Sequence, residues 1–218
     1  MKVVESAPFG VPRLEGSLIR LDLLSLEHVP ALIEAGSEDA SLYAWTPFPK
    51  TASAMQQYVE TALTGWQRGQ MLPFAIIRLT DGKIVGSTRY YAIERWAWPP
   101  GHRGHGRVTP DVCEIGYTWL ARSAVRSGVN TQAKRLLLGH AFETWQVHRV
   151  SFRTDARNVT SRKAIERLGA KLDGRLRSER PGADGTVRDS VVYSIVADEW
   201  PAVSETLRRL ESRDPTPG

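Results

Sequence analysis

Hydrophobic and polar residues alternate along the N-terminal part of the chain in a pattern that separates a strand from two helices. Segment 17–24 (SLIRLDLL) alternates apolar and polar residues, which is typical of a strand with one buried face. Ser25 stands where a helix cap is expected, and Gly36 is placed to end that helix. A second helix is expected over 53–68, because apolar residues recur at helical spacing and Gly69 follows.

The next segment, 73–91, has the pattern of two antiparallel strands joined by a tight turn. Asp81 and Gly82 supply the two turn residues, since glycine accepts the positive backbone angle that such a turn requires. Segment 92–111 is rich in proline, glycine and histidine and has no regular period. We expect a long loop there.

Strands and helices alternate in the second half of the chain. Segment 113–120 (CEIGYTWL) has the aromatic and β-branched content of a strand, and a helix is expected over 131–145. Segment 149–155 alternates again, Asn158 is placed to cap the next helix, and Gly169 to end it. Two strands and a helix should complete the chain, at 171–179, 187–196 and 198–212. This order predicts a mixed α/β protein.

Composition narrows the class of protein without identifying an activity. A chain of 218 residues with 41% hydrophobic and 24% charged residues fits one globular domain. No stretch approaches the roughly 20 apolar residues that span a bilayer, and the N-terminus lacks the apolar core of a signal peptide. Cys113 is the only cysteine, which suits a reducing compartment. We therefore expect a cytoplasmic protein without a membrane partner.

The net charge of +5 favours anionic partners, and a nucleotide cofactor, an acidic protein and RNA all fit it. The arginines of 175–213 alternate with acidic residues, as on a solvated surface, and no nucleic-acid motif accompanies them. A nucleic-acid partner is therefore disfavoured. His102 and His105 lack carboxylate or thiolate neighbours at ligand spacing, so no metal site is expected.

A glycine-containing turn connects the strand at 113–120 to the helix that follows. The first turn of a helix leaves backbone N–H groups unpaired and carries the positive end of the helix dipole, so it can bind an anion. Gly128 has no side chain to block close approach, and Asn130 or Thr131 can cap the helix. Many helices begin in this way for capping alone, so the turn by itself does not identify a phosphate site.

Four sequence blocks, in order, resemble the GNAT family of N-acetyltransferases and, within it, the branch that acetylates N-terminal amines of ribosomal proteins. They are EIGYTWL, NTQAKRLLLGHAF, HRVSFRTDARNVTSRKAIERLGAKLDGRLR and RDSVVYSIVADEW. The resemblance implies one acetyltransferase domain over 14–200, flanked by an N-terminal extension (1–13) and a helix end and tail (201–218). It implies a mixed, largely antiparallel sheet with a central splayed pair of parallel strands and helices on both faces.

In that family acetyl-coenzyme A lies between the two splayed strands, which here would be 114–120 and 149–155. By position, Asn158 and Ser161 would face the pantetheine and its sulfur. The backbone that would pair with the pantetheine arm belongs to Trp119, Leu120 and Ala121. The turn that would hold the pyrophosphate consists of Arg126, Ser127, Gly128, Val129, Asn130 and Thr131.

The turn departs from the family's pattern of arginine or glutamine, two residues, glycine, one residue, then glycine or alanine. Val125 stands first, Arg126 takes the place of a glycine, Gly128 is kept and Asn130 is last. The bulkier residues would hold a pyrophosphate farther from the backbone, whereas an arginine could replace lost amide contacts by its charge. A catalytically silent member that binds coenzyme A weakly, with a regulatory or interaction role, is therefore the alternative.

Acetyl transfer needs a neutral amine, a donor for the thioester oxygen and a proton for the leaving thiolate. Glu114 is the candidate base: related enzymes often use a carboxylate on this strand, and apolar neighbours would raise its pKa. An outward-facing or arginine-paired Glu114 is the alternative. Ser161 could donate to the sulfur or bond only to its own helix. A backbone N–H near Tyr117 or Thr118 would serve as the oxyanion donor.

The acceptor is expected to be a primary amine, either a protein N-terminus or a small-molecule amine such as an aminoglycoside or polyamine, attacking directly in a ternary complex. An α-amine has a pKa near 7.7–8, against about 10.4 for lysine, so it is easier to deprotonate. Four aromatic residues could wall a substrate cleft, although core packing or loop anchoring explains them as well: Trp45, Tyr90, Trp96 and Trp98. A homodimer is a further possible arrangement.

Overall fold

The computed structural model describes residue 10 and residues 12–213. The strands are β1 (Leu14–Glu15), β2 (Ile19–Leu23), β3 (Leu72–Arg78), β4 (Ile84–Glu94), β5 (Val112–Leu120), β6 (Arg149–Asp155), β7 (Lys171–Pro181) and β8 (Val187–Val196). The α-helices are α1 (Val29–Ser37), α2 (Ala52–Gln67), α3 (Val129–Gly139), α4 (Val159–Arg167) and α5 (Trp200–Arg213). Most of the expected N-terminal extension (1–13) and the last residues of the tail (214–218) lie outside the described residues.

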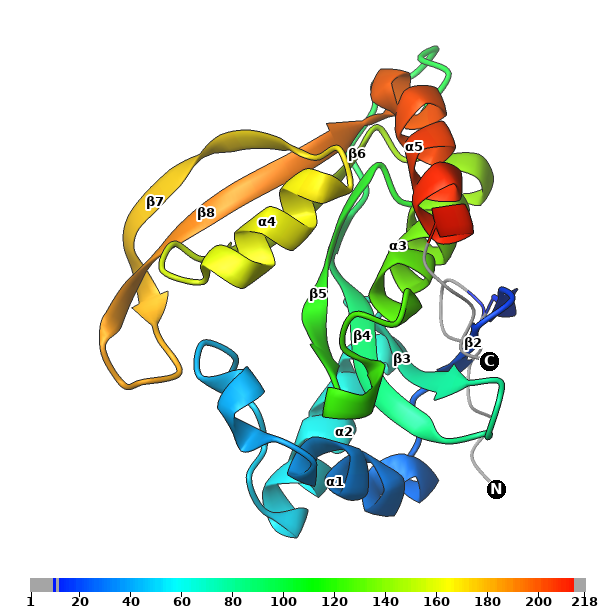
Figure 1. Cartoon of the computed structure of the whole chain (residues 1–218). Helices are drawn as coiled ribbons and strands as arrows, with labels where there is room; N and C mark the ends of the chain where they lie inside the picture. Colours follow the sequence, from blue (N-terminus) through cyan, green and yellow to red (C-terminus); the bar gives the residue numbers. More distant parts are fainter. Residues whose placement is uncertain (1–9, 11, 214–218) are drawn as a thin grey trace, which may run out of the picture.

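The eight strands form one sheet in the order β1-β2-β3-β4-β5-β6-β8-β7 (Figure 1). Every neighbouring pair is antiparallel except β5 and β6, which run parallel. Helices α1 and α2 pack on β4 and β3, while α3 and α5 pack against each other on the other face. The expected mixed sheet with one parallel pair and helices on both faces is confirmed.

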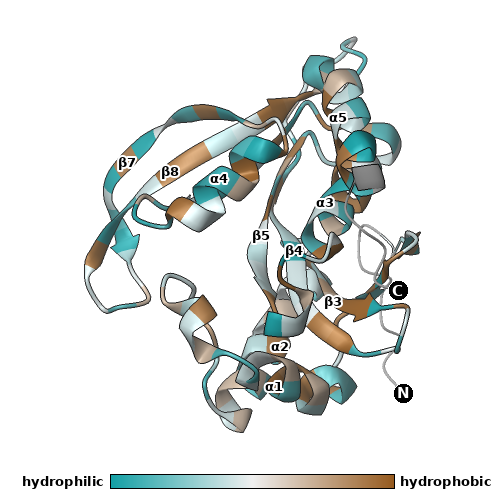
Figure 2. Cartoon of the chain, in the orientation of Figure 1, coloured by the Kyte–Doolittle hydropathy of each residue, from teal (hydrophilic) through white to brown (hydrophobic). Residues whose placement is uncertain are grey.

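Local sequence signals account for most element boundaries. Thr51 accepts the Ala54 N–H and so caps α2, which buries Met55, Val59 and Ala62. Gly82 takes a φ of 69° in the turn that joins β3 to β4. Figure 2 shows β3 mostly in brown and β7 mostly in teal, which matches the burial of β3 and the exposure of β7.

Two helices differ from the predicted boundaries. A 3-10 turn, Leu26–His28, precedes α1, which begins at Val29 because Pro30 lacks an N–H and suits the first turn of a helix. Helix α3 begins at Val129 rather than Thr131, and after Gly139 the chain continues as a π-helix, His140–Thr144. None of the helices in the described ranges is long and apolar enough to cross a membrane.

Strands β5 and β6 separate soon after they begin. Their pairing runs from Val112 opposite Arg149 to Glu114 opposite Ser151. Farther along, the register of β5 against β4 shifts at Tyr117, which has a φ of 50°. Beyond Glu114 the two strands no longer pair, and we call the region between their diverging ends the V. In Figure 1 the β7–β8 hairpin arches away from the rest of the sheet and bends toward the connection between α1 and α2.

Candidate functional site

The turn that opens α3 keeps a glycine-like backbone despite its departures from the family pattern. Gly128 is the N-cap residue, with a φ of 80° and no side-chain cap hydrogen bond. Arg126, in a position where a glycine was expected, also has a positive φ, 62°. A left-handed residue with a side chain costs roughly 1–2 kcal/mol, so the surrounding structure holds this strained shape. Successive N–H groups in such a turn form a concavity that suits anions.

The side chains of this turn are arranged differently from the prediction. Neither Asn130 nor Thr131 caps the helix, because α3 begins two residues earlier than expected. The buried Thr131 hydroxyl instead accepts a hydrogen bond from Arg167 Nη2 at 3.2 Å. Arg126 is exposed. A cavity of about 220 Å³ adjoins the turn and is lined by Leu18, Arg78, Thr80, Asp81, Ser123, Ser127 and Val129.

The backbone between Trp119 and Ala121 is less free than the resemblance implied. The Leu120 carbonyl accepts a hydrogen bond from the Tyr43 hydroxyl at 2.9 Å, and the Ala121 N–H donates to Val85 O at 2.8 Å. The Trp119 ring is buried against other aromatic rings. Pairing of this segment with a pantetheine arm stays a prediction, and it would have to use other backbone groups.

Glu114 lies at the vertex of the V, on the last residue of β5 that pairs with β6. Its side chain is buried, accepts a hydrogen bond from the Tyr91 hydroxyl, and lies 3.5 Å from Arg153 Nη2 through Oε2. Burial raises the pKa of Glu114, and the Tyr91 hydrogen bond and the Arg153 charge oppose that rise only in part. The sequence left a buried Glu114 and an arginine-paired Glu114 as alternatives. In the structure Glu114 is both buried and paired with Arg153.

A second carboxylate near Arg153 behaves in the opposite way. Glu179 of β7 bonds Arg153 and Arg180 and accepts from Ser190 Oγ at 2.7 Å. Burial opposes ionisation, but hydrogen bonds from Arg180, Ser190 and Arg153 lower the pKa of Glu179 to about 2. Two carboxylates whose environments drive their pKa values apart have different roles available to them. Glu179 stays charged, whereas Glu114 can exchange a proton.

Asn158 and Ser161 open the helix after β6. Asn158 Oδ1 accepts the Ser161 N–H at 3.0 Å, so the predicted cap of α4 is confirmed. Ser161 stands in the first turn of the helix and is half-buried. Contact of either residue with pantetheine stays a prediction.

The four candidate substrate aromatics do not line one cleft. Tyr90 is fully buried and donates to the Leu137 carbonyl of α3 at 2.5 Å, so its placement in a substrate cleft was wrong. Strand alternation explains the error: Tyr91 reaches Glu114, whereas Tyr90, one position earlier, points to α3 on the opposite face. Trp96 and Trp98 are tied to the loop by Asp111, through the Trp96 backbone N–H at 2.8 Å and Trp98 Nε1 at 2.9 Å.

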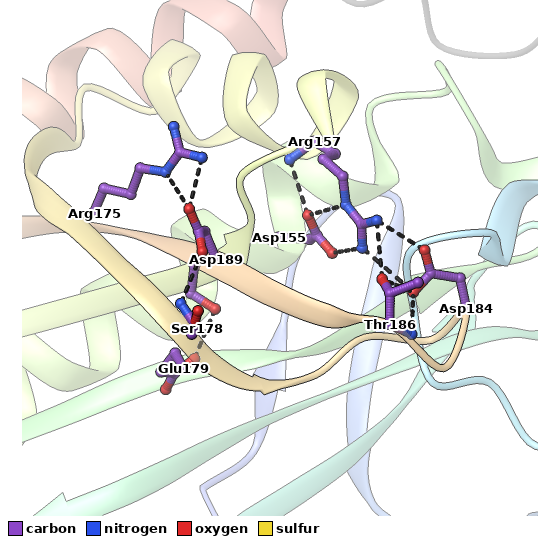
Figure 3. Close-up of polar contacts among 9 residues, drawn as sticks. Asp155, Arg157, Arg175, Ser178, Glu179, Asp184, Thr186 and Asp189 are labelled. Carbon is purple, nitrogen blue, oxygen red and sulfur yellow. Dashed lines mark hydrogen bonds and ion pairs between the residues drawn. The ribbon is translucent and has the colours of Figure 1, made fainter.

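Trp45 lies in a different place, where Arg157 holds three segments together (Figure 3 draws the polar contacts). The Arg157 guanidinium lies 4.4 Å from the Trp45 ring centroid. It also bonds Asp155 at the end of β6 and Asp184 in the β7–β8 hairpin, each at 2.8 Å, and Thr186 Oγ1 at 3.2 Å. We call these five residues the Arg157 clasp. The clasp connects the end of β6 to the β7–β8 hairpin and to the segment between α1 and α2 that carries Trp45.

Replacing Arg157 by leucine should loosen the hairpin tip. We expect faster amide hydrogen exchange in residues 182–186, because the tip loses its charged anchor. Arg175→Leu is the matched control: Arg175 bonds Asp189 in the same hairpin, at 2.6 Å, without bridging to another segment (Figure 3). Equal exchange rates in the two variants would contradict a role for the clasp in holding the hairpin tip.

Sequence reasoning missed the polar partners of Glu114. Tyr91 and Arg153 come from β4 and β6, which flank β5, and Glu179, which bonds Arg153, comes from β7. The available signal was alternation, because Ser151 and Arg153 are polar residues two positions apart on a predicted strand. No group of three or more histidine, cysteine or acidic side chains that could hold a metal ion occurs within the described part of the chain.

Comparisons with known proteins agree with this architecture. The sequence model of the acetyltransferase (GNAT) domain matches residues 19–171. YdaF of Bacillus subtilis (strain 168), a proposed ribosomal N-acetyltransferase, is 27% identical over 158 residues, covering 72% of this chain and 78% of YdaF.

Two crystal structures extend the comparison. A proposed acetyltransferase from T. thermophilus is 33% identical, with a TM-score of 0.75 and 93% of this chain and 98% of that chain covered. Mycobacterium smegmatis RimJ, in complex with CoA-disulfide, is 22% identical, with a TM-score of 0.72 and 88% of each chain covered.

Proposed function

Because this chain belongs to the GNAT acetyltransferase domain family and is an N-acetyltransferase, we propose that its acceptor is the α-amine of a protein N-terminus. The acetyl group would come from acetyl-coenzyme A by direct attack of the amine in a ternary complex. The observation that carries the proposal is Glu114, a buried carboxylate with a raised pKa at the vertex of the V. YdaF is described as a ribosomal N-acetyltransferase, and this supports a protein acceptor.

The residues of the α3 turn fit the diphosphate of coenzyme A. The N-cap Gly128 has no side chain, no side-chain cap fills the start of α3, and both Arg126 and Gly128 adopt left-handed backbone angles. Backbone N–H groups from 126 to 131 would hold the diphosphate, and the exposed Arg126 guanidinium would add a positive charge. Bound acetyl-coenzyme A would supply an acetyl thioester.

Glu114 is the group that would take the proton from the amine, directly or through water. At pH 7 deprotonating an α-amine costs about 1.2 kcal/mol, whereas a lysine amine costs about 4.6 kcal/mol. A single carboxylate whose pKa is only partly raised is therefore better matched to an α-amine. The backbone N–H groups at the Tyr117 bulge would polarise the acetyl carbonyl, and the Ser161 hydroxyl would donate to the sulfur.

Two measurements test the proposal. Acetyl-coenzyme A at 100 times its dissociation constant should stabilise the native protein by about 2.7 kcal/mol in a thermal-shift titration. A peptide with a free N-terminus and one internal lysine should gain a single acetyl group on its α-amine, located by mass spectrometry. The same peptide with a blocked N-terminus should remain unmodified.

Two results would contradict the proposal in different ways. Absence of a thermal shift at millimolar acetyl-coenzyme A would favour the catalytically silent alternative. Acetylation of the lysine in the blocked peptide would show that the protein is an acetyltransferase but would overturn the α-amine as its acceptor.

A further inference from the structure

Arg89 of β4 is a buried cation without a salt bridge in the described part of the chain. Its side chain is 2% exposed. Its guanidinium lies between two aromatic rings, 4.4 Å from the Tyr58 centroid and 4.2 Å from the Tyr117 centroid. Nη1 contacts the Met71 sulfur at 3.6 Å, while Nε and Nη2 are buried and have no hydrogen-bond partner among residues 12–213. The two rings are therefore the principal contacts of this charge.

This arrangement is expensive for a purely structural element. Removing an ion from water is costly unless a counter-charge and hydrogen bonds compensate. A desolvated cation over an aromatic ring recovers only part of that cost. Apolar side chains of similar volume would fill the space between α2 and β4 at lower cost. A costly arrangement next to backbone strain is characteristic of functional sites.

The strained residue is Tyr117. Its φ of 50° places a large side chain in the left-handed region, and it forms the bulge where two residues of β5 oppose Thr88 of β4. The bulge lies three residues beyond Glu114, within the part of β5 that no longer pairs with β6. The Tyr117 ring is 45% exposed, and Arg89 and Tyr91 contact its faces and edges.

The next residue is held from the opposite face of the sheet. Lys134 of α3 donates to Thr118 Oγ1 at 2.6 Å, and the Thr118 and Thr88 hydroxyl oxygens lie 2.8 Å apart. The two bulge residues are thus contacted by two different buried basic side chains: Tyr117 by Arg89, and Thr118 by Lys134, whose pKa burial lowers to about 7. Of the two, only the Arg89 contact restrains the residue that carries the strain.

We propose that Arg89 is a positioning residue for acetyl transfer: it clamps the Tyr117 ring and so holds the β5 bulge in the shape that presents its backbone N–H groups to the V. This inference rests on the proposed function, because it assigns the bulge N–H groups to the acetyl carbonyl. Arg89 touches neither substrate. It acts through Tyr117.

The test uses Arg89→Met, which removes the charge while keeping a long apolar side chain. We expect kcat to fall about tenfold with little change in the KM for acetyl-coenzyme A, because the α3 turn is untouched and only the bulge shifts. Amide hydrogen exchange at residues 116–119 should become faster in the free protein. Arg20→Met, which breaks an ion pair with Asp22 on β2, should change neither quantity.

A glycine at position 117 separates positioning from general stability. Tyr117→Gly adopts a positive φ without a clamp, so Arg89→Met should lower kcat by less than about twofold when added to Tyr117→Gly. If Arg89→Met does not fold, Tyr117→Asn and Tyr117→Val replace it. Both variants lose the ring, but asparagine tolerates the left-handed region and valine does not. The valine variant should therefore have the lower kcat.

Equal effects of Arg89→Met in the wild-type background and in the Tyr117→Gly background, or unchanged exchange at 116–119, would overturn the clamp. Equal rates for the asparagine and valine variants would also overturn it. A wild-type protein that acetylates no α-amine would contradict the proposed function instead. The exchange measurement on the free protein would still decide whether Arg89 holds the bulge.

Discussion

Replacing Gly128 by valine should raise the dissociation constant for acetyl-coenzyme A by at least about 100-fold, equivalent to roughly 2.7 kcal/mol. Gly128 is buried, stands at the N-cap of α3 and has a φ of 80°. A β-branched residue is a strong outlier at such an angle, so the turn would have to change shape. Its side chain would also lie where the backbone N–H groups should meet the diphosphate. Isothermal titration of the apo protein measures the effect.

Gly101→Val is the matched control for that variant. Gly101 has a φ of 85°, nothing lies within 4 Å of the position of its missing Cβ, and it belongs to the loop between β4 and β5. Backbone strain is therefore similar in the two variants, while only one alters the candidate anion site. Tight binding by Gly128→Val, or an equal loss in both variants, would remove the α3 turn from the cofactor site.

The second large effect is expected for Glu114→Gln, which should lower kcat by about 100-fold to 1000-fold, because general-base catalysis contributes on that scale. The isosteric amide should preserve the thermal shift with acetyl-coenzyme A. Steady-state kinetics with the free-N-terminus peptide measure the loss. Glu60→Gln, an exposed change on α2, is the control and should be neutral. Unchanged turnover in Glu114→Gln would exclude Glu114 from the mechanism.

The pH dependence of the same variant gives an independent check. Burial raises the pKa of Glu114, so wild-type activity should fall as the pH decreases through that raised value, and the glutamine variant should lack this limb. A carboxyl group whose pKa is higher in the folded state contributes stability that is present at low pH and is lost as the pH rises through the folded pKa. The wild type should therefore lose this contribution on going from acid to neutral pH, and Glu114→Gln should not.

The α3 turn shows how a residue comparison can mislead. By its letters the turn departs from the family, since Arg126 stands in for a glycine. In the structure Arg126 takes a left-handed φ of 62°, so the backbone keeps the path that a glycine would allow. Side-chain identity reports how easily a residue reaches a conformation. It does not report whether the rest of the fold holds the residue there.

The Glu114 surroundings show a different limit. Glu114 was identifiable because the family that the chain resembles often uses a carboxylate on this strand, and its apolar neighbours indicated burial. Arg89, Arg153 and Glu179 were not identifiable as its neighbours or as supports of the bulge, because they lie 25, 39 and 65 positions away in the chain (114 − 89, 153 − 114 and 179 − 114). Tyr90 was misplaced for a related reason: a one-residue difference in strand phase moves a side chain to the opposite face.

By itself, the sequence determined the kind and order of most elements and the position of the turn before α3. These follow from local physics: hydrophobic period, the cap at Asn158, and a glycine where the chain reverses at Gly82. Tertiary structure alone decided which polar side chains meet in the V, and which carboxylate has a raised pKa and which a lowered one. Those outcomes depend on strand register, burial and charges contributed by distant segments, and no local pattern encodes them.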